Sequence, residues 1–413
     1  MSSRKRIGAL LVAVVAAFLA ALAGSIHSAR AAGPTLTIWT DQGRLNAVTQ
    51  VANQWAAKNP GVQLNIVVKN FGDIESDVGT VAAGSAPDVI ISENDWTGQL
   101  AANGLVEPIY LSAAVKKQFP AYTLNAFSYG IAVKHLYGVP VQIENIGLVV
   151  NTKLAKVPTS WNQLVQEALA FKKKKSGNLA IAVQQGSGGD AYHMYPFFSG
   201  LGGYIFGTNS AGNLDPSNIG VANKAFLKNA SLIDQWNKEG LINSAVDSST
   251  AQNAFLKGQA AFWVTGPWNS QLLEQSGIQF KIVQIPKIVD PAVPFLGVGG
   301  FMVTKYAVSD GTDALANDLV ENYMTTPAAQ LLLANAGGRY PANTIAGKQD
   351  TDPVLAEFGR ASTGGVPMPN IPQMASVWTD LGAAWVNATK GAGATPAKQA
   401  FTAAARSIAD KIG

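Results

Sequence analysis

The chain has 413 residues, of which 47% are hydrophobic and 14% are charged, so it has material for two or three cores and is not a disordered chain. Its formal net charge is +4, but the first 31 residues carry four basic residues and no acid. The remainder is therefore formally neutral, which argues against nucleic acid as a partner. The chain has no cysteine, so we expect no disulfide, no thiolate metal site and no lipid anchor on a cysteine.

Residues 1–31 are typical of an export signal. A basic segment, Arg4-Lys5-Arg6, precedes an apolar run from Ile7 to Ala23, and Ala29-Arg30-Ala31 fits a signal-peptidase site. The apolar run is long for a signal peptide and short for a membrane span. Cleavage and retention as an anchor are both open, and we favour cleavage. We therefore expect the protein to lie outside the cytoplasm, either in a periplasm or at the cell surface.

Strands and helices alternate in the first part of the mature chain. Short connections between alternating elements predict a parallel sheet covered by helices on both faces. In such sheets ligands bind at the carboxyl ends of the strands, and polar residues such as Asp41, Arg44 and Asp95 follow these strands here. The periodicity predicts strands at 36–40, 62–68 and 88–91, and helices at 45–58, around 81–82 and up to 103–104.

The segment 139–151 has apolar, β-branched ends and a polar middle that contains Gln142, Glu144 and Asn145. Pro140 and Gly147 flank these polar residues as structure breakers. Extended backbone that crosses a polar gap between two cores would fit this pattern, with Glu144 facing a cleft. The alternative is a strand in one continuous core that turns its polar residues to solvent.

Further α/β elements follow this segment. We expect a helix at 161–175, a strand at 177–184, a glycine-rich aromatic loop at 186–195, helices near 222–238, 249–257 and 314–324, a strand at 260–264 and a C-terminal helix. Additional crossings are expected at 284–286 and 325–328. The predicted organisation is two lobes joined by hinges, one made of residues 32–143 and 287–325, the other of residues 146–283 and 328–413.

Catalytic and cofactor motifs are lacking in the sequence. There are three histidines, no metal-binding His-x-x-x-His motif and no Gly-x-Ser-x-Gly motif, so we expect no enzyme activity, cofactor or metal. Paired carboxylates of a glycosidase are not excluded, because their pairing is spatial. Several aromatic residues stand in loops or at strand exits, where rings suit the apolar faces of sugars: Trp96, Tyr192, Tyr195, Trp268 and Trp378. In contrast, four tryptophans are expected to lie in the core: Trp39, Trp55, Trp236 and Trp263.

These residues resemble the maltose-binding type of extracytoplasmic solute-binding protein, which serves ABC importers. The most specific match is Met368-Pro-Asn-Ile-Pro-Gln-Met374 followed by Trp378, and Gly266-Pro-Trp268 and Glu144 also match. The resemblance covers essentially the whole mature chain. It implies an α/β fold of the periplasmic-binding-protein type II, whose two lobes close on an oligosaccharide about three hinge crossings.

By position, the resemblance also implies a set of ligand-binding residues. Asp95 and Glu144 would accept sugar hydroxyls, Arg44 would donate to them, and Asp190 would add an acceptor. The aromatic platforms would be Tyr192, Tyr195, Trp268 and Trp378, with Met368 on the same wall. Some positions depart from the family pattern: Ser92 replaces a cleft tryptophan, for which Trp96 could substitute, Gly43 replaces an acid and Gly382 replaces an arginine.

Two functions remain open from the sequence. One is binding of maltose, maltodextrin or another α-glucoside by a monomer that delivers it to ABC permease subunits. The other is a secreted carbohydrate-active enzyme or lectin that acts on α-glucans.

Overall fold

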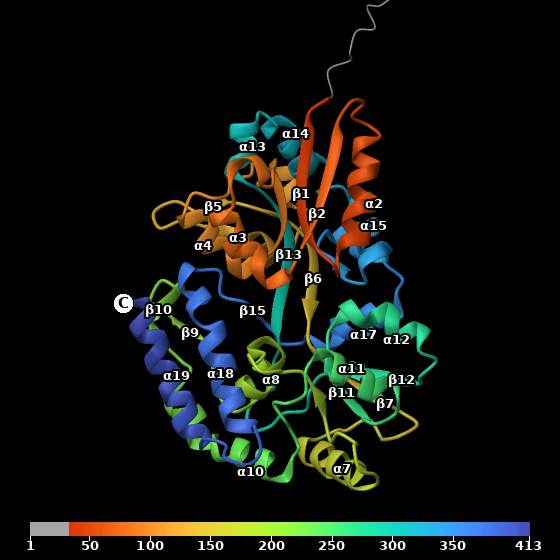
Figure 1. Cartoon of the computed structure of the whole chain (residues 1–413), viewed down its shortest axis with the longest axis vertical. Helices are drawn as coiled ribbons and strands as arrows, with labels where there is room; N and C mark the ends of the chain where they lie inside the picture. Colours follow the sequence, from red (N-terminus) through yellow and green to blue (C-terminus); the bar gives the residue numbers. More distant parts are fainter. Residues whose placement is uncertain (1–32) are drawn as a thin grey trace, which may run out of the picture.

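The computed structural model describes residues 33–413, which form two lobes stacked along the long axis (Figure 1). The N-terminal lobe contains a seven-stranded sheet in the order β14-β6-β13-β3-β1-β2, with β15 paired to β13. β1 runs parallel to β2 and β3, as the alternating pattern predicted, whereas β13 runs antiparallel to β3 and β6. The sheet is therefore mixed, with the strands β1 (Thr35–Asp41), β2 (Gln63–Lys69), β3 (Val89–Glu93), β6 (Val139–Asn145), β13 (Phe295–Val303), β14 (Tyr340–Pro341) and β15 (Val366–Pro367).

The C-terminal lobe contains a four-stranded sheet in the order β12-β7-β11-β8. The strand expected at 177–184 is shorter in the structure. It consists of Ala182–Val183, which pair in parallel with β11. The strands are β7 (Gly147–Asn151), β8 (Ala182–Val183), β11 (Phe262–Thr265) and β12 (Phe280–Val283), and two separate hairpins are made by β4 (Ser128–Tyr129) with β5 (His135–Leu136) and by β9 (Phe206–Thr208) with β10 (Leu214–Ile219).

The helices follow from apolar spacing and local caps. In α2, Val48, Val51 and Trp55 are buried on one face, and in α7 the Ser160 hydroxyl accepts a hydrogen bond from the amide of Gln163. The helix expected at 314–324 is α14 followed by a π-helical turn, η5 (Asp318–Tyr323). The helices are α2 (Leu45–Ala56), α3 (Ile74–Thr80), α4 (Thr97–Ala102), α5 (Ala113–Lys116), α6 (Ala121–Ala126), α7 (Trp161–Lys173), α8 (Ala191–Gly200), α9 (Lys224–Asn229), α10 (Ser231–Glu239), α11 (Ser248–Leu256), α12 (Ser270–Gln275), α13 (Lys305–Asp310), α14 (Asp313–Asn317), α15 (Pro327–Gly337), α16 (Thr344–Gln349), α17 (Pro353–Ala361), α18 (Trp378–Thr389) and α19 (Ala397–Ile412).

Separate apolar cores stabilise the two lobes. One contains Trp39 and Trp55 and lies in the N-terminal lobe. Another contains Trp236 and lies among the helices of the C-terminal lobe, and a smaller cluster with Trp263 covers the other face of its sheet. The four tryptophans predicted to be core residues are therefore buried, which confirms that expectation.

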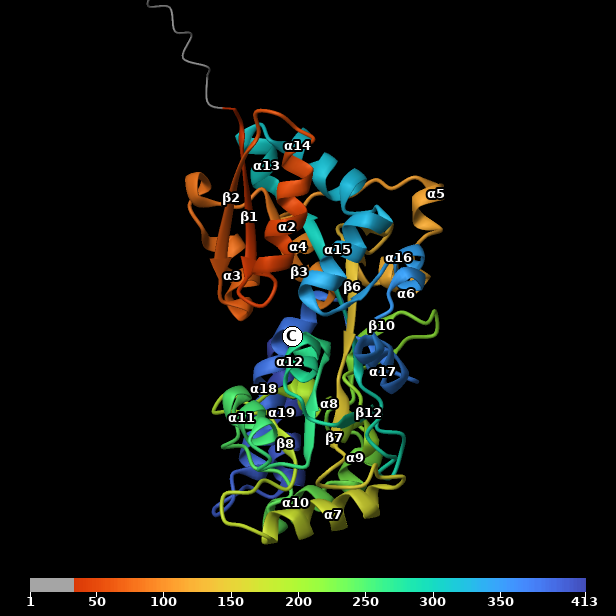
Figure 2. The same cartoon turned by 90° about the vertical axis from the view of Figure 1, so that its right-hand side faces the viewer.

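The first crossing of the chain between the lobes lies in the segment 139–151, as expected. β6 pairs in the large sheet, β7 pairs in the small one, and the pairing changes at Ile146. In Figures 1 and 2, β6 runs from the upper lobe toward the lower one. The polar middle of this segment is buried between the two cores, which is the first of the two interpretations of the sequence.

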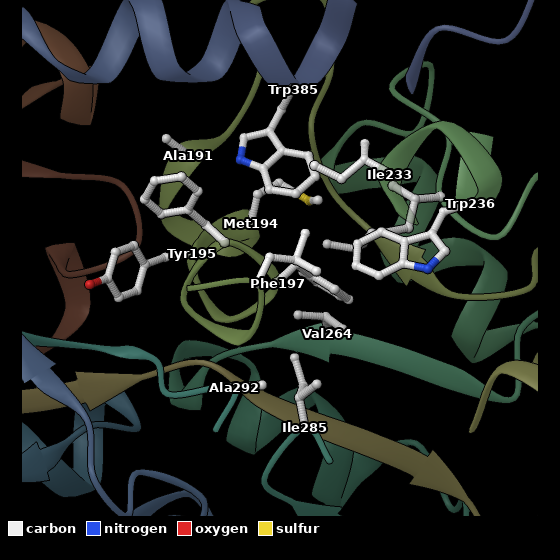
Figure 3. Close-up of a cluster of buried hydrophobic side chains, with 14 of the residues drawn as sticks. Ala191, Met194, Tyr195, Phe197, Ile233, Trp236, Val264, Ile285, Ala292 and Trp385 are labelled. Atoms are coloured by element: carbon white, nitrogen blue, oxygen red, sulfur yellow. The ribbon is translucent and has the colours of Figure 1, made fainter. Parts of the chain in front are cut away.

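The second crossing was expected at 284–286, and this placement is wrong. Ile285, Ala292 and Phe295 are buried in the same C-terminal core as Trp385, and Figure 3 shows Ile285 and Ala292 beside that cluster. The chain enters the large sheet only at β13, which pairs with β15 from Phe295 and with β6 from Leu296. The hydrophobic side chains of 285–295 hold this segment in the C-terminal lobe until that point.

The third crossing was expected at 325–328, and this placement is also wrong. Thr326 and Pro327 begin α15, which packs against α2 and buries Ala329 and Leu333 in the N-terminal core. β14 then joins the large sheet. The chain crosses only after α16, because α17 packs on β12 in the C-terminal lobe. Within residues 33–413, no helix is long and apolar enough to cross a membrane.

Candidate ligand-binding site between the lobes

The parallel strands of the large sheet end at the boundary between the lobes. β1 ends at Asp41 and Arg44 directly precedes α2. β3 ends at Glu93, and the 3-10 turn η3 (Asn94–Trp96) follows it. The carboxyl ends of β1 and β3 therefore bring charged side chains to the same edge, where ligands bind in α/β sheets.

Two arginines organise the carboxylates at this edge. Arg44 Nη1 lies 2.7 Å from Asp41 Oδ2, and Arg44 Nη2 contacts Glu93 Oε1 and lies 4.0 Å from Glu144 Oε2. Arg339 Nε donates to Glu144 Oε2 at 2.7 Å. All five residues are buried, so each charge depends on these partners rather than on water.

Arg44 is held on several sides. In the orientation that satisfies both groups, Gln142 presents its amide oxygen to Arg44 Nε and Nη2 at 3.0 Å. The guanidinium also lies 5.1 Å from the centre of the Phe71 ring. Although burial opposes its charge, the surrounding carboxylates raise the pKa of Arg44. Its donors are thus directed to protein carboxylates, which positions those groups at the site.

The carboxyl groups differ in their affinity for protons. Burial, together with the smaller effect of the Glu144 charge, raises the pKa of Asp95 to about 6, although a hydrogen bond from Trp378 opposes the rise. Burial and then Asp95 raise the pKa of Glu75 to about 8. Burial, followed by the charge of Glu144, raises the pKa of Glu93 well above its usual range. Asp41 differs, because Arg44 outweighs burial and lowers its pKa.

The C-terminal lobe presents an aromatic wall to these carboxylates. Tyr192, in the first turn of α8, lies 6.2 Å from Trp268 of the 3-10 turn η4 (Pro267–Asn269) and 6.2 Å from Phe295, measured between ring centres. Trp378, the first residue of α18, meets Phe295 edge-on at 5.9 Å. The indole of Trp268 lies over Gly266, where a Cβ would lie 2.3 Å from the ring.

Direct contacts join the two faces. Trp378 Nε1 donates to Asp95 Oδ2 at 2.9 Å, and Asn94 Nδ2 donates to the carbonyl of Met368 at 2.9 Å. Asn370 Nδ2 donates to backbone carbonyls at the end of α6, including that of Ala126 at 3.0 Å. The lobes are therefore in contact across the site, and a ligand as large as an oligosaccharide would enter only after they separate.

The structure brings together six of the ten predicted site residues: Arg44, Asp95, Glu144, Tyr192, Trp268 and Trp378. Tyr192 belongs with the carboxylates because Glu144, Glu93, Asp190 and Asp95 all raise its pKa after burial. Contrary to expectation, Tyr192 and Tyr195 lie within α8 and not in the glycine-rich loop.

Four predicted site residues have other contacts. Trp96 is buried in the N-terminal core, with its ring 5.2 Å from Phe71. Tyr195 stacks on Phe295 at 3.5 Å. Asp190 is the N-cap of α8 and accepts from the amide of His193 at 2.9 Å. Met368 is buried in the C-terminal core. A contact of any of these side chains with a ligand stays a prediction.

Several residues at the site were not predicted. Glu93 lies two residues after the predicted strand 88–91 and is the last residue of β3 in the structure, so its position near a strand exit was an available signal. Arg339 follows α15 and pairs with Glu144, which lies 195 residues earlier, so no local pattern points to it. Phe295, the first residue of β13, was not among the predicted site residues.

The glycine that replaces an arginine in the family pattern has a structural cause. A Cβ on Gly382 would lie 2.9 Å from the carbonyl oxygen of Gly188, and a Cβ on Gly189, whose φ is +76°, would lie 2.2 Å from the carbonyl oxygen of Gly382. The loop before α8 thus packs directly against α18, and a long side chain at 382 has no room. Ser92 is also buried, and its hydroxyl donates to the carbonyl of Gly300 at 3.0 Å. Within residues 33–413, no group of three or more acidic or histidine side chains is arranged to hold a metal ion.

Comparisons with known proteins agree with this architecture. Residues 50–356 match the family model of bacterial extracellular solute-binding proteins. The galactooligosaccharide-binding protein of Bacillus subtilis is 26% identical, over 92% of this chain and 90% of that protein. The maltotriose-binding protein of Pyrococcus abyssi is also 26% identical, over 83% of this chain and 75% of that protein.

The fold itself is matched by a solved structure, that of the Thermus thermophilus maltotriose-binding protein bound with maltotriose. The TM-score is 0.80 at 26% identity, and the match covers 92% of this chain and 100% of the other. This likeness confirms the expected two-lobe fold of the periplasmic-binding-protein type II. With a family model that covers most of its length, the chain belongs to the bacterial extracellular solute-binding proteins.

Proposed function

We propose that the protein binds an oligosaccharide, such as maltose, maltodextrin or another α-glucoside, between its lobes and delivers it to an ABC import permease. The observation that carries this proposal is the pairing of a carboxylate edge with an aromatic wall, joined by the contact from Trp378 to Asp95. Aromatic rings pack against the apolar faces of sugars, and carboxylates accept hydrogen bonds from their hydroxyls. Relatives whose names specify galactooligosaccharides, maltodextrin and maltotriose support the same ligand class.

Binding proceeds by hinge closure in this proposal. The lobes separate about the crossings at Ile146, within β13 and after α16, the sugar enters, and both faces then contact it. Ligand stabilises the closed form only to the extent that it binds that form more tightly than the open one. The protein acts as a monomer outside the cytoplasm, exported by the segment 1–31, which lies outside the described residues.

The protein releases its ligand unchanged and is not an enzyme. In the alternative function, a secreted glycosidase, two carboxyl groups would flank a glycosidic bond as acid and as base or nucleophile. The carboxylates Asp41 and Glu144 are instead paired with arginines, and Asp95 accepts from an indole. These contacts favour binding of hydroxyls over proton transfer to a leaving group.

A panel of sugars tests this function. Purified protein is heated with maltose, maltotriose, trehalose or a galactooligosaccharide, and the melting temperature is recorded for each. We expect at least one sugar to raise the melting temperature, because a ligand that binds only the native state stabilises it. Prolonged incubation with maltotriose followed by an assay for reducing ends should show no new ends. No shift with any sugar would refute the proposal, and new reducing ends would establish the enzyme alternative.

A further inference from the structure

Two polar atoms at the site have no hydrogen-bond partner among residues 33–413: Glu93 Oε2 and Tyr192 Oη. Both atoms are inaccessible to water in the closed form. A buried polar atom without a partner costs free energy, and native proteins seldom leave one unsatisfied. These two atoms come from opposite lobes and lie at one candidate site. They indicate that a polar group of a bound ligand supplies the missing hydrogen bonds.

We propose that Glu93 is a ligand-contact residue, whose Oε2 hydrogen-bonds an oxygen of the bound oligosaccharide alongside Tyr192 Oη. This proposal rests on the proposed function and adds a residue that neither the family pattern nor the aromatic wall assigns.

The position of Glu93 directs one oxygen to the protein and one to the ligand. Glu93 is the last residue of β3 and is 3% exposed. Its Oε1 contacts Arg44 Nη2, so the carboxyl group is fixed and Oε2 remains available. A carboxyl group that is held by one oxygen loses little conformational entropy when the other binds a ligand.

Tyr192 and Glu144 border the same space. A Cβ on Gly297 of β13 would lie 3.2 Å from Tyr192 Oη and 3.5 Å from Glu144 Oε1. Glu144 is fixed by Arg339 through its other oxygen, Oε2. The absence of a side chain at 297 leaves these polar groups room at the point where the two lobes meet.

The charges around Glu93 favour a neutral ligand. The groups that face it are Glu144 and Asp95, which raise its pKa after burial, and Arg44 and Arg339, which lower it, with Tyr192 opposite. The net direction is a raised pKa, which favours the protonated form of Glu93, and Oε2 is the oxygen that does not contact Arg44. A protonated Oε2 donates to a hydroxyl, ring or glycosidic oxygen, all of which a neutral sugar offers. An amine-bearing sugar would instead require an ionised Glu93.

Calorimetric titration of variants with maltotriose tests the proposal. Glu93→Gln keeps a neutral group that donates and accepts, so its affinity should stay within about threefold of the unmodified protein. Glu93→Ala should weaken binding by at least about tenfold, as loss of a buried ligand contact does. Asp41→Asn is the matched control, because it removes another anionic partner of Arg44, and it should weaken binding less than Glu93→Ala.

The pH dependence provides a readout that a purely structural role would not change. A pKa that is raised on closure favours binding at low pH, and this contribution is lost as pH rises toward the raised value. Between the ordinary pKa of such a carboxyl group and its raised value, the dissociation constant should therefore rise by up to about tenfold per pH unit. Glu93→Gln should reduce this slope.

The outcomes separate this proposal from the proposed function. If the unmodified protein binds no sugar of the panel, the proposed function fails. If it binds maltotriose but Glu93→Ala binds equally well, or Asp41→Asn loses as much affinity, only the role of Glu93 fails. If Glu93→Ala does not fold, an unchanged pH slope in Glu93→Gln overturns the proposal. Binding that tightens with rising pH would also overturn it in favour of an amine-bearing ligand.

Discussion

Replacing single tryptophans should separate ligand platforms from core residues. Trp268 and Trp378 are partly exposed at the aromatic wall, whereas Trp55 is 1% exposed in α2. Trp55→Ala should destabilise the fold by about 3–5 kcal/mol, and it also leaves Asp318, which accepts from Trp55 Nε1 at 2.8 Å, without that partner. Trp268→Ala and Trp378→Ala remove less buried surface and should change the stability of the fold much less.

The effect on binding should be the reverse. Loss of a stacking platform at a binding hot spot costs about 2 kcal/mol, which corresponds to about a thirtyfold rise in dissociation constant. Trp378→Phe keeps an aromatic ring but removes the donor to Asp95. Its dissociation constant for the sugar should therefore lie between those of the unmodified protein and Trp378→Ala.

Thermal melting and calorimetric titration with maltotriose measure both quantities for the same four variants. Normal affinity in Trp268→Ala and Trp378→Ala would show that the aromatic wall is not the ligand site. Melting as early as that of Trp55→Ala would show that both tryptophans belong to the core.

Further predictions follow from contacts around the site. Gly266→Ala places a Cβ 2.3 Å from the Trp268 ring, so the indole must move, and sugar affinity should fall while the far-ultraviolet circular dichroism spectrum is unchanged. Arg339→Met removes the arginine 2.7 Å from the buried Glu144 and leaves only Arg44, at 4.0 Å. It should lower the free energy of unfolding by about 3–5 kcal/mol, as measured by urea denaturation; an unchanged midpoint would show that the Arg339–Glu144 pair does not stabilise the fold. The pKa of Asp95 is raised to about 6 in the closed form, whereas a solvated carboxyl keeps its usual value of about 4. Closure is therefore favoured by protonation below pH 4, and this contribution is lost as pH rises to 6, so the scattering radius of the ligand-free protein should increase over that range.

The first crossing was predictable from the sequence because its signal is local. Gln142 and Glu144 interrupt an apolar strand pattern between Pro140 and Gly147, and such a pattern fits backbone that leaves one core and enters another. The second and third crossings were misplaced because nothing local distinguishes a lobe change from an ordinary loop. Thr326-Pro327 is a helix start, and only packing of α15 against α2, over 270 residues earlier in the chain, assigns it to the N-terminal lobe.

The candidate site was predictable to the extent that its residues lie in motifs. Trp268 and Trp378 stand beside proline-containing turns, and Asp95 follows a strand. Arg339 was missed because its partner Glu144 lies 195 residues away. Glu93 lies close to a predicted strand exit, but its contact with Arg44, 49 residues earlier, is not visible in the sequence. Arg44 was expected to face the sugar, but its ion pairs with Asp41 and Glu93 depend on distances that no sequence pattern contains.

Small-angle X-ray scattering with and without maltotriose tests the central claim most directly. The structure has its lobes in contact, with Trp378 bonded to Asp95 and Asn94 bonded to the Met368 carbonyl. Binding between lobes therefore requires a more open ligand-free form at neutral pH, and the radius of gyration should decrease at saturating sugar toward that of the closed structure. If calorimetry shows saturation but the radius does not change, maltotriose does not bind by closure of these two lobes.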